Sequence, residues 1–289
     1  MKTDWVYLRK CEQGCVPARP VEITEVFTLF LRCCERPFVF AGEMHEPWEM
    51  VYVRKGEASI TADDKVYTLS PGSLIFHKPM EFHQIHAKNP GLEILVSSFK
   101  MFGDRAKEFQ NAVFHLSDAE KEDMEDLIER CTTLNGGCYG DSGDWDCRPF
   151  WQANPLAFYS CINCLEGIFC SVLMRAPNRK QPKQTADCAL FKKIISILEE
   201  CIHTDITIQD VAERCGVSAS GVKTCFSRHA GCGIHKYFLK IKMRTAIQMI
   251  RQGCTVSEVS DTLGFNNPNY FSYVFRRETG KRPTDFRLK

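Results

Sequence analysis

The chain has 289 residues, with 37 basic residues, 36 acidic residues and a net charge of +1. This length accommodates two domains of ordinary size, and the composition is that of a soluble globular protein. The N-terminal stretch MKTDWVYLRKCEQG lacks the apolar core of a signal peptide, and no apolar run approaches the roughly 18–20 residues of a membrane span. These features exclude secretion and membrane insertion, so we expect a cytoplasmic protein.

The sixteen cysteines are expected to be reduced thiols, because the chain has no secretory signal. Their spacings form no paired C-x-x-C zinc pattern. Cys161, Cys164 and Cys170 lie in an apolar helical stretch, where free thiols pack as small hydrophobic groups. A redox role for Cys161 and Cys164 is the alternative. Three more cysteines fall around a glycine-rich loop: Cys131, Cys138 and Cys147.

Short strands are expected in the N-terminal part. Residues 22–34 read as one strand, and residues 38–99 alternate apolar and polar positions between turn residues. This pattern predicts a small antiparallel barrel or sandwich. A capping box at Ser117–Glu120 opens a helix to about Thr133, and a second, mostly apolar helix is expected from about Pro149 to Met174. Both need a surface to pack on, either their own barrel or a second copy of the chain.

Residues 176–184 contain two prolines, three cations and no large apolar residue, and are predicted to be a linker. The charge is divided across this boundary. Residues 185–289 hold 16 basic and 10 acidic residues, a net charge of +6, so the remainder carries −5. A basic C-terminal third joined to an acidic remainder is typical of a DNA-binding module with a separate sensor, although charge alone does not exclude chance.

A helix, a tight turn and a second helix are predicted near the C-terminus. Thr255 and Glu258 form a capping box, and Gly264 ends the first helix, because glycine adopts a left-handed conformation without steric cost. Asn267 caps the second helix and Pro268 occupies its first position. This helix has a polar and basic free face, as expected of a recognition helix that enters a DNA major groove.

The same unit occurs once more, so that the two helix-turn-helix units span about 206–231 and 255–280. Residues 234–251 between them are predicted to form one helix about 27 Å long. This length places the two units about one DNA turn apart. In the first unit, Val211, Ala212 and Val217 are the expected core positions. Gly221 is expected to weaken its recognition helix, because glycine costs about 1 kcal/mol relative to alanine.

The free faces of the two recognition helices supply the candidate DNA contacts. Asparagine pairs well with adenine and lysine with guanine, whereas arginines that contact phosphates fix the register without reading sequence. For each residue the alternative is an ordinary solvated helix face. The predicted base-facing residues are Ser220, Lys223, Thr224, Asn269, Ser272 and Tyr273. The predicted phosphate contacts are Arg228, Arg276, Arg277, Lys281 and Arg282.

Residues 185–289 resemble the AraC/XylS-type DNA-binding domain over nearly their whole length. The resemblance rests on Ala212, Gly216, Val217, Ser218, Phe226, Lys242, Arg244, Ala246, Gly264, Phe265, Tyr270, Phe271, Phe275, Arg276, Gly280, Pro283 and Arg287. It implies a ligand-responsive transcription regulator, mostly an activator in this family, that acts as a homodimer on double-stranded DNA and works with RNA polymerase. A small-molecule effector, with sugars among the candidates, would be sensed in the N-terminal barrel.

The order of residues in the barrel resembles a cupin. Enzymatic cupins carry H-x-H, then a glutamate, and a histidine in a second motif. This chain has His45, Glu49 and His83, but Pro47 where the second histidine would stand, so one metal ligand is missing. We expect no catalytic residue and no cofactor, and these three residues are assigned to a ligand pocket. A metal held by His45, Glu49 and His83, in a metal-dependent enzyme fused to the DNA-binding domain, is the alternative. The predicted aromatic walls are Trp48, Tyr52, Phe76, Phe82 and His86.

The predicted fold is therefore an α+β chain of two domains. A cupin-like antiparallel barrel occupies residues 1–105, and a helical dimerisation region, 106–175, is attached to it. After the linker, an all-α domain at 185–289 carries two helix-turn-helix units joined by a long helix.

Overall fold

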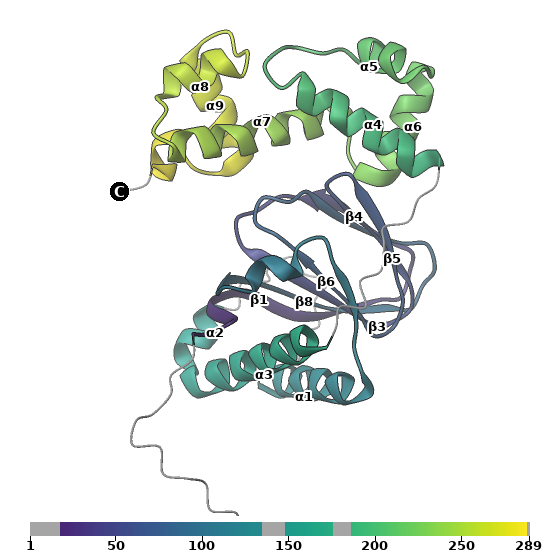
Figure 1. The fold of residues 1–289 in the computed structure, drawn as a ribbon, viewed down its shortest axis with the longest axis vertical. Helices are drawn as coiled ribbons and strands as arrows, with labels where there is room; N and C mark the ends of the chain where they lie inside the picture. Colours follow the sequence, from purple (N-terminus) through teal and green to yellow (C-terminus); the bar gives the residue numbers. More distant parts are fainter. Residues whose placement is uncertain (1–17, 135–147, 176–185, 288–289) are drawn as a thin grey trace, which may run out of the picture.

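The computed structural model describes residues 18–134, 148–175 and 186–287. Figure 1 shows three layers: helices at one end, two β-sheets in the middle, and the C-terminal helical domain at the opposite end. The glycine-rich loop with Cys138 and Cys147, and the predicted linker, lie outside the described residues.

The central layer consists of two antiparallel sheets that face each other. The five-stranded sheet has the order β1-β8-β3-β6-β9 and the four-stranded sheet the order β2-β7-β4-β5. The strands are β1 (Glu22–Cys34), β2 (Phe38–Glu43), β3 (Trp48–Lys55), β4 (Ala58–Ala62), β5 (Lys65–Leu69), β6 (Ser73–His77), β7 (His83–Ala87), β8 (Leu92–Phe102) and β9 (Val113–His115). Each strand expected between residues 22 and 100 is present. The expected boundary at residue 105 leaves out β9, which pairs with β6.

Strand β3 is buried on both of its faces. Val51 and Val53 point between the sheets and pack with Ile60, Ile85 and Ile94. The alternate residues, Trp48, Met50 and Tyr52, point to the other side, where they join a separate apolar cluster formed with the helices below. Apolar residues in succession are expected in a strand that is covered on both faces.

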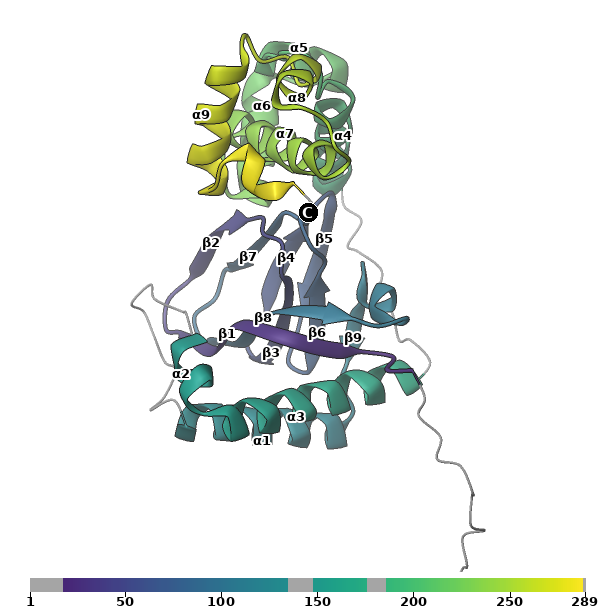
Figure 2. The same ribbon diagram turned by 90° about the vertical axis from the view of Figure 1, so that its left-hand side faces the viewer.

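Helices α1 (Asp118–Leu134), α2 (Arg148–Ala153) and α3 (Pro155–Met174) form the layer beneath the five-stranded sheet (Figures 1 and 2). A short 3-10 turn, η1 (Ala106–Phe109), precedes β9. The helix expected from Pro149 to Met174 is interrupted at Asn154, because Pro155 has no N–H to donate and restricts the residue before it. Pro155 instead starts α3.

Among the described helices, α3 is the one that is long and apolar enough to cross a membrane by length and composition. It has 20 residues, and an 18-residue window within it has a mean hydropathy of 1.6. Leu165 and Phe169 on one side of α3 are buried in the apolar cluster beneath the sheet. This packing is that of a core helix in a folded domain.

The C-terminal domain is all α-helical, as predicted. Its elements are α4 (Ala186–Glu200), α5 (Ile208–Cys215), α6 (Ala219–Ala230), α7 (Ile234–Arg251), α8 (Val256–Thr262), α9 (Pro268–Thr279) and the 3-10 turn η2 (Pro283–Phe286). Helices α5 and α6 form the first helix-turn-helix unit, and α8 and α9 form the second. Figure 1 shows the two units at opposite ends of α7, which covers the predicted residues 234–251.

A capping box opens the first helix of each helix-turn-helix unit, at Thr207 and at the predicted Thr255. The hydroxyl of Thr207 accepts a hydrogen bond from the Asp210 N–H at 3.2 Å, and the Thr255 hydroxyl accepts one from the Glu258 N–H at the same distance. Asn267 caps α9 by accepting from the Tyr270 N–H at 2.8 Å. These local signals define the start of each helix, which explains why their boundaries are readable from sequence.

Two glycines that follow the first helix of each unit differ in their surroundings. Gly216 and Gly264 both have positive φ angles, 74° and 70°. A Cβ atom added at Gly216 would meet nothing within 4 Å, but one added at Gly264 would lie 2.8 Å from the carbonyl oxygen of His203. Gly264 is therefore constrained by backbone conformation and by a close neighbour.

Gly216→Ala is expected to lower the free energy of unfolding by about 1–2 kcal/mol, the cost of a left-handed alanine. Gly264→Ala is expected to cost more, because the methyl group would also displace the His203 carbonyl. Urea denaturation of the two variants measures the difference. Equal destabilisation of the two would contradict the role assigned to the His203 contact.

Candidate DNA-binding surface and sensor cavities

The free faces of α6 and α9 carry the predicted base-facing residues. Five of the six are exposed and Ser272 is half-buried; the exposed ones are Ser220, Lys223, Thr224, Asn269 and Tyr273. On the opposite face of α9, Phe271, Val274 and Phe275 are fully buried, as predicted.

Val217 is 38% exposed, so its predicted place in the core is wrong: it follows the left-handed Gly216 and lies in the turn. Gly221 lies in a regular helix, where its N–H donates to the capping hydroxyl of Ser218 at 3.1 Å.

The predicted phosphate contacts are also exposed: Arg228, Arg276, Arg277, Lys281 and Arg282. Two of them lie close to the barrel. Arg228 lines a cavity together with Glu57 and Lys88, and Lys281 lines a second cavity with Glu43. The C-terminal ends of α6 and α9 therefore face the barrel in this arrangement, which leaves less room there for a DNA backbone.

A cavity of about 340 Å³ lies inside the barrel. Its walls are mainly aromatic and aliphatic, with a cation at Arg32 and a polar end near the β2–β3 loop. The lining residues are Phe27, Thr28, Phe30, Arg32, Phe38, Phe40, Glu43, His45, Pro47, Glu49, Ile85, Ile94, Val96 and Ser98. An apolar pocket with a few convergent polar groups is the usual form of a small-molecule site.

The predicted aromatic walls are wrong. Trp48, Tyr52 and Phe76 are buried beneath the five-stranded sheet, where Phe76 packs against Phe169 of α3 with ring centroids 4.9 Å apart. Phe82 packs against the DNA-binding domain. His86 lines the cavity that also contains Arg228 of α6, here called the outer cavity. The alternation along β3 and β6 separates the residues on the two faces of each strand. It does not show which face lines the barrel cavity, because helices bury the opposite face of the sheet. Residues on β1 and β2 form the walls instead.

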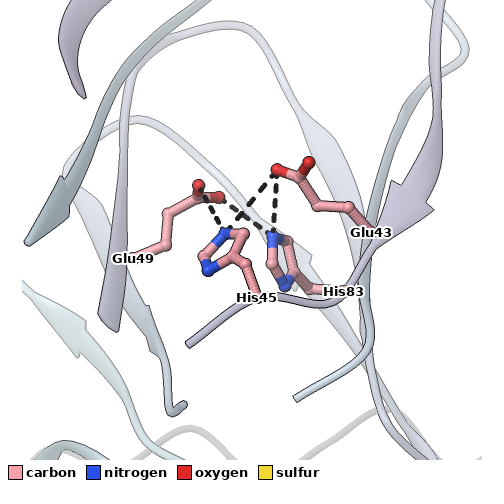
Figure 3. A group of neighbouring side chains, drawn as sticks. All are labelled: Glu43, His45, Glu49 and His83. Carbon is pink, nitrogen blue, oxygen red and sulfur yellow. Dashed lines mark ion pairs between the residues drawn. The ribbon is translucent and has the colours of Figure 1, made fainter. Parts of the chain in front are cut away.

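At the polar end of the barrel cavity, Glu43, His45, Glu49 and His83 meet. One ligand atom from each lies within 4.8 Å of the others, and Figure 3 shows the four side chains pointing toward one another. The Nε2 atom of His83 is 3.2 Å from Glu49 Oε1, and that of His45 is 3.4 Å from Glu49 Oε2. Both Nε2 atoms are 3.7 Å from Glu43 Oε1.

Glu43 is not among the site residues predicted from the sequence. The cupin comparison indicated that Pro47 occupies the position of a missing ligand, but the fourth member of the cluster precedes His45 rather than following it. Glu43 pairs with His83 in the β2–β7 register, past an irregularity between Phe40 and Glu43. The sequence does contain a signal for Glu43, because Glu43 and His45 form an E-x-H motif. This motif indicates a shared site only when Glu43 is known to pair with His83.

The cluster is strongly coupled electrically. Burial by itself lowers the pKa of His83, because it disfavours the charged imidazolium. The nearby Glu49 carboxylate outweighs this effect and raises the pKa of His83 to about 10. In the same way, burial opposes ionisation of Glu49, while His83 and His45 hold the pKa of Glu49 well below its usual range. Positive charge is thus favoured between the two carboxylates.

The DNA-binding domain packs directly on the mouth of the barrel. Arg244 of α7 donates to Asp63 Oδ1 at 3.0 Å and to the Met80 carbonyl at 3.3 Å. Lys240 donates to the Gly42 carbonyl at 3.0 Å, and Arg251 pairs with Glu46. The interface therefore joins α7 to the loops that surround the polar cluster.

A cavity of about 530 Å³ lies in this interface. It shares Phe27, Glu43, His45 and Pro47 with the cavity inside the barrel. On the other side it is lined by α7 residues, among them Lys240 and Arg244. The wall that separates the two cavities is therefore also part of the contact between the domains.

Cys161 and Cys164 of α3, the pair named for the alternative redox role, have different partners. The Sγ atom of Cys161 lies 3.9 Å from that of Cys131 on α1, and both thiols are buried. Cys164 instead donates to the Asp123 carbonyl at 3.5 Å. The packing assigns these thiols to the helix interface, in accord with the expectation of core cysteines.

A β-barrel with an internal cavity, joined to two helix-turn-helix units, defines the class of a transcription regulator with a ligand-binding domain. Two family models match the chain: "AraC-like ligand binding domain" at residues 31–124 and "Helix-turn-helix domain" at residues 198–289. The chain belongs to the AraC family of transcription regulators, as the resemblance implied.

Characterised and uncharacterised regulators are similar over most of the chain. The HTH-type transcriptional activator RhaR of Enterobacter sp. (strain 638) is 23% identical over 261 residues, which cover 86% of this chain and 87% of RhaR. The uncharacterised regulator YidL of Escherichia coli (strain K12) is 23% identical over 240 residues, or 82% and 74% of the two chains. A crystal structure of ToxT from Vibrio cholerae with a bound unsaturated fatty acid covers 92% of this chain and 96% of ToxT, at 13% identity and a TM-score of 0.37.

Proposed function

We propose that this protein is a cytoplasmic, ligand-responsive transcription activator that senses a small molecule in the barrel cavity. The observation that carries the proposal is the shared wall between that cavity and the domain interface. Glu43, His45 and Pro47 line both spaces, and Glu46 of the same loop pairs with Arg251 of α7. An effector that displaces this loop changes the contact with the DNA-binding domain.

Such a switch requires different affinities of the effector for two arrangements of the domains. In the arrangement seen here, Arg228 and Lys281 face the barrel, so DNA binding competes with the interface. Effector binding would release the domain, and activation would follow from recruitment of RNA polymerase at the promoter. The name of RhaR as an activator supports this direction.

The experiment that tests the proposal starts from an operator selected from random-sequence DNA with the full chain. Small metabolites, sugars among them, are then screened for a thermal shift. A compound that stabilises the protein is expected to change operator affinity as well. Operator affinity that stays constant while the compound occupies the barrel would contradict the switch but not the DNA-binding function.

Base-facing and phosphate-facing residues are expected to behave differently on that operator. Lys223→Ala and Asn269→Ala should each reduce discrimination at one base pair by about 1–3 kcal/mol. Arg277→Ala should weaken binding to all sequences alike and reduce the salt dependence by about one phosphate contact. Binding to a set of single-base operator variants at several salt concentrations measures both quantities. Uniform weakening by Asn269→Ala would remove that residue from the base-facing set.

We also propose that the protein is a homodimer formed through α3. Leu156, Tyr159 and Met174 are among the most exposed large apolar side chains of the described chain, at 87%, 62% and 77%. At helical spacing they follow one side of α3, opposite the side buried on the barrel. An isologous contact between two copies would cover this stripe.

Leu156→Glu is therefore expected to shift the protein from dimer to monomer, because it places a charge in the apolar contact. Light scattering over a range of protein concentrations measures the mass. Gln152→Glu on α2, which is also exposed, is the matched control and should leave the dimer intact. A monomeric wild-type chain would contradict the proposal.

A further inference from the structure

We propose that Glu43, His45, Glu49 and His83 form a binding site for a divalent first-row transition-metal ion. The four side chains come from β2, the β2–β3 loop, β3 and β7, and converge at the barrel mouth (Figure 3). The inference goes beyond effector sensing, because the ion would bind whether or not an organic effector occupies the cavity.

The orientation of the two imidazole rings is set by backbone carbonyls. His45 Nδ1 is 3.0 Å from the Pro47 carbonyl oxygen, and His83 Nδ1 is 3.1 Å from the Glu81 carbonyl oxygen. A carbonyl only accepts, so each Nδ1 carries a proton and donates it. In the neutral ring, Nε2 then carries a free lone pair, which is the arrangement found for metal-binding histidines.

Both Nε2 atoms point at carboxylates. Neither Nε2 atom makes a hydrogen bond to any residue in the described ranges, although both are buried. Their nearest polar neighbours are oxygens of Glu49 and Glu43, at 3.2–3.7 Å. Two imidazole acceptors facing two carboxylate acceptors are mutually repulsive unless a cation or protons lie between them.

The spacing of the donor atoms matches a metal site. Zinc–nitrogen and zinc–oxygen bonds of about 2.0–2.2 Å place the ligand atoms of a tetrahedral site about 3.3–3.6 Å apart. The nitrogen–oxygen separations are 3.2 and 3.7 Å for His83 and 3.4 and 3.7 Å for His45, and they bracket that range, although each imidazole faces a different oxygen of Glu49. With one ligand atom taken from each residue, the four atoms lie within 4.8 Å of one another. Only small side-chain movements are needed to place one ion at bonding distance from all four residues.

The surrounding structure holds Glu43 and Glu49 in place. Gly42 has φ +80°, and a Cβ atom there would lie 2.4 Å from the ring of Phe82, so only glycine brings the chain this close. Glu43 then lies beside His83 although its side chain is 48% exposed. The Ser98 hydroxyl donates to Glu49 Oε2 at 3.4 Å, the kind of outer contact that orients a ligating carboxylate.

The donor set selects the class of ion. Imidazole and carboxylate ligands suit Mn²⁺, Fe²⁺, Co²⁺, Ni²⁺ and Zn²⁺, whereas Cu⁺ prefers sulfur. No cysteine belongs to the cluster among the residues that the structure describes. Because His45 also lines both cavities, the ion would be reached from the interface and could accept an oxygen ligand from either side.

Cobalt titration of the full-length protein, after removal of metals by a chelator, tests the site. Co²⁺ bound by nitrogen and oxygen gives visible d–d absorption without the near-ultraviolet charge-transfer bands of thiolate ligands, so it separates this site from the sixteen cysteines. We expect one equivalent with a nitrogen–oxygen spectrum. Elemental analysis of protein purified without chelator gives an independent readout.

Glu43→Gln and His83→Asn are each expected to weaken Co²⁺ binding at least about tenfold. Glu43 is half-exposed, so its variant tests the site even if His83→Asn fails to fold. His86→Asn is the matched control on the same strand, because His86 faces the outer cavity, and should bind like the wild type. No stoichiometric uptake, a thiolate spectrum, or equal binding by Glu43→Gln and His86→Asn would overturn the proposal.

Discussion

Lys242→Met is expected to lower the free energy of unfolding by about 2–4 kcal/mol and to reduce operator affinity at least about tenfold. Lys242 is 5% exposed, and its ammonium donates to the Leu263 carbonyl at 2.8 Å and the Thr204 carbonyl at 3.1 Å. Methionine fills a similar volume but leaves both oxygens without a donor. These oxygens belong to the α4–α5 connection and the end of α8, so the loss loosens one helix-turn-helix unit relative to the other.

Lys236→Met on the same helix is the control, because Lys236 is exposed. Thermal unfolding and operator titration of both variants separate the buried hydrogen bonds from the loss of one positive charge. The role assigned to Lys242 is wrong if the two variants have the same melting temperature. It is also wrong if Lys242→Met loses stability but binds a two-site operator with unchanged affinity.

Arg244→Ala is expected to raise the effector-free affinity of the full chain for operator DNA by about 5- to 30-fold. The change removes the hydrogen bonds to Asp63 and Met80, which are two of the contacts that hold the DNA-binding domain on the barrel. Partly buried charged hydrogen bonds of this kind contribute about 1–2 kcal/mol, and each 1.4 kcal/mol is tenfold in affinity. An equilibrium titration at fixed salt measures the effect.

Loss of a cation by itself weakens DNA binding. An increase in operator affinity on Arg244→Ala would therefore come from the loss of the contact between the two domains. Lys236→Ala provides the matched loss of charge and should bind DNA more weakly than the wild type. In an Asp63→Ala background, Arg244→Ala should add less than it does in the wild type, because only its hydrogen bond to the Met80 carbonyl remains to be lost at the interface. Unchanged or weakened binding by Arg244→Ala would show that the interface does not restrain the DNA-binding domain.

The helices of the DNA-binding domain could be predicted closely because their start and stop signals are local. Capping boxes at Thr207 and Thr255 and the proline at position 268 mark helix starts within a few residues of the groups they satisfy. The helix stop at Gly264 is also local, although its contact with the His203 carbonyl is not. Local hydrogen bonds need no knowledge of the rest of the fold.

The sensor site could be predicted only in part because it depends on strand register and on what covers each sheet. His45, Glu49 and His83 are brought together as expected, yet Glu43 joins them only through the β2–β7 pairing. Trp48 and Tyr52 alternate correctly with Glu49 and Val51, but α1 and α3 bury their side of the sheet. Alternation distinguishes two faces of a strand and does not say which one encloses the cavity.

The position of α3 has a consequence for the arrangement of operator half-sites. Helix α3 and the helix-turn-helix units lie at opposite ends of the barrel (Figure 1). A dimer formed through α3 would hold its two DNA-binding domains at the far poles of the particle, with both barrels between them. Half-sites placed one after another on straight DNA could then be occupied together only after the domains leave the barrels, whereas distant half-sites could be joined by a loop of DNA.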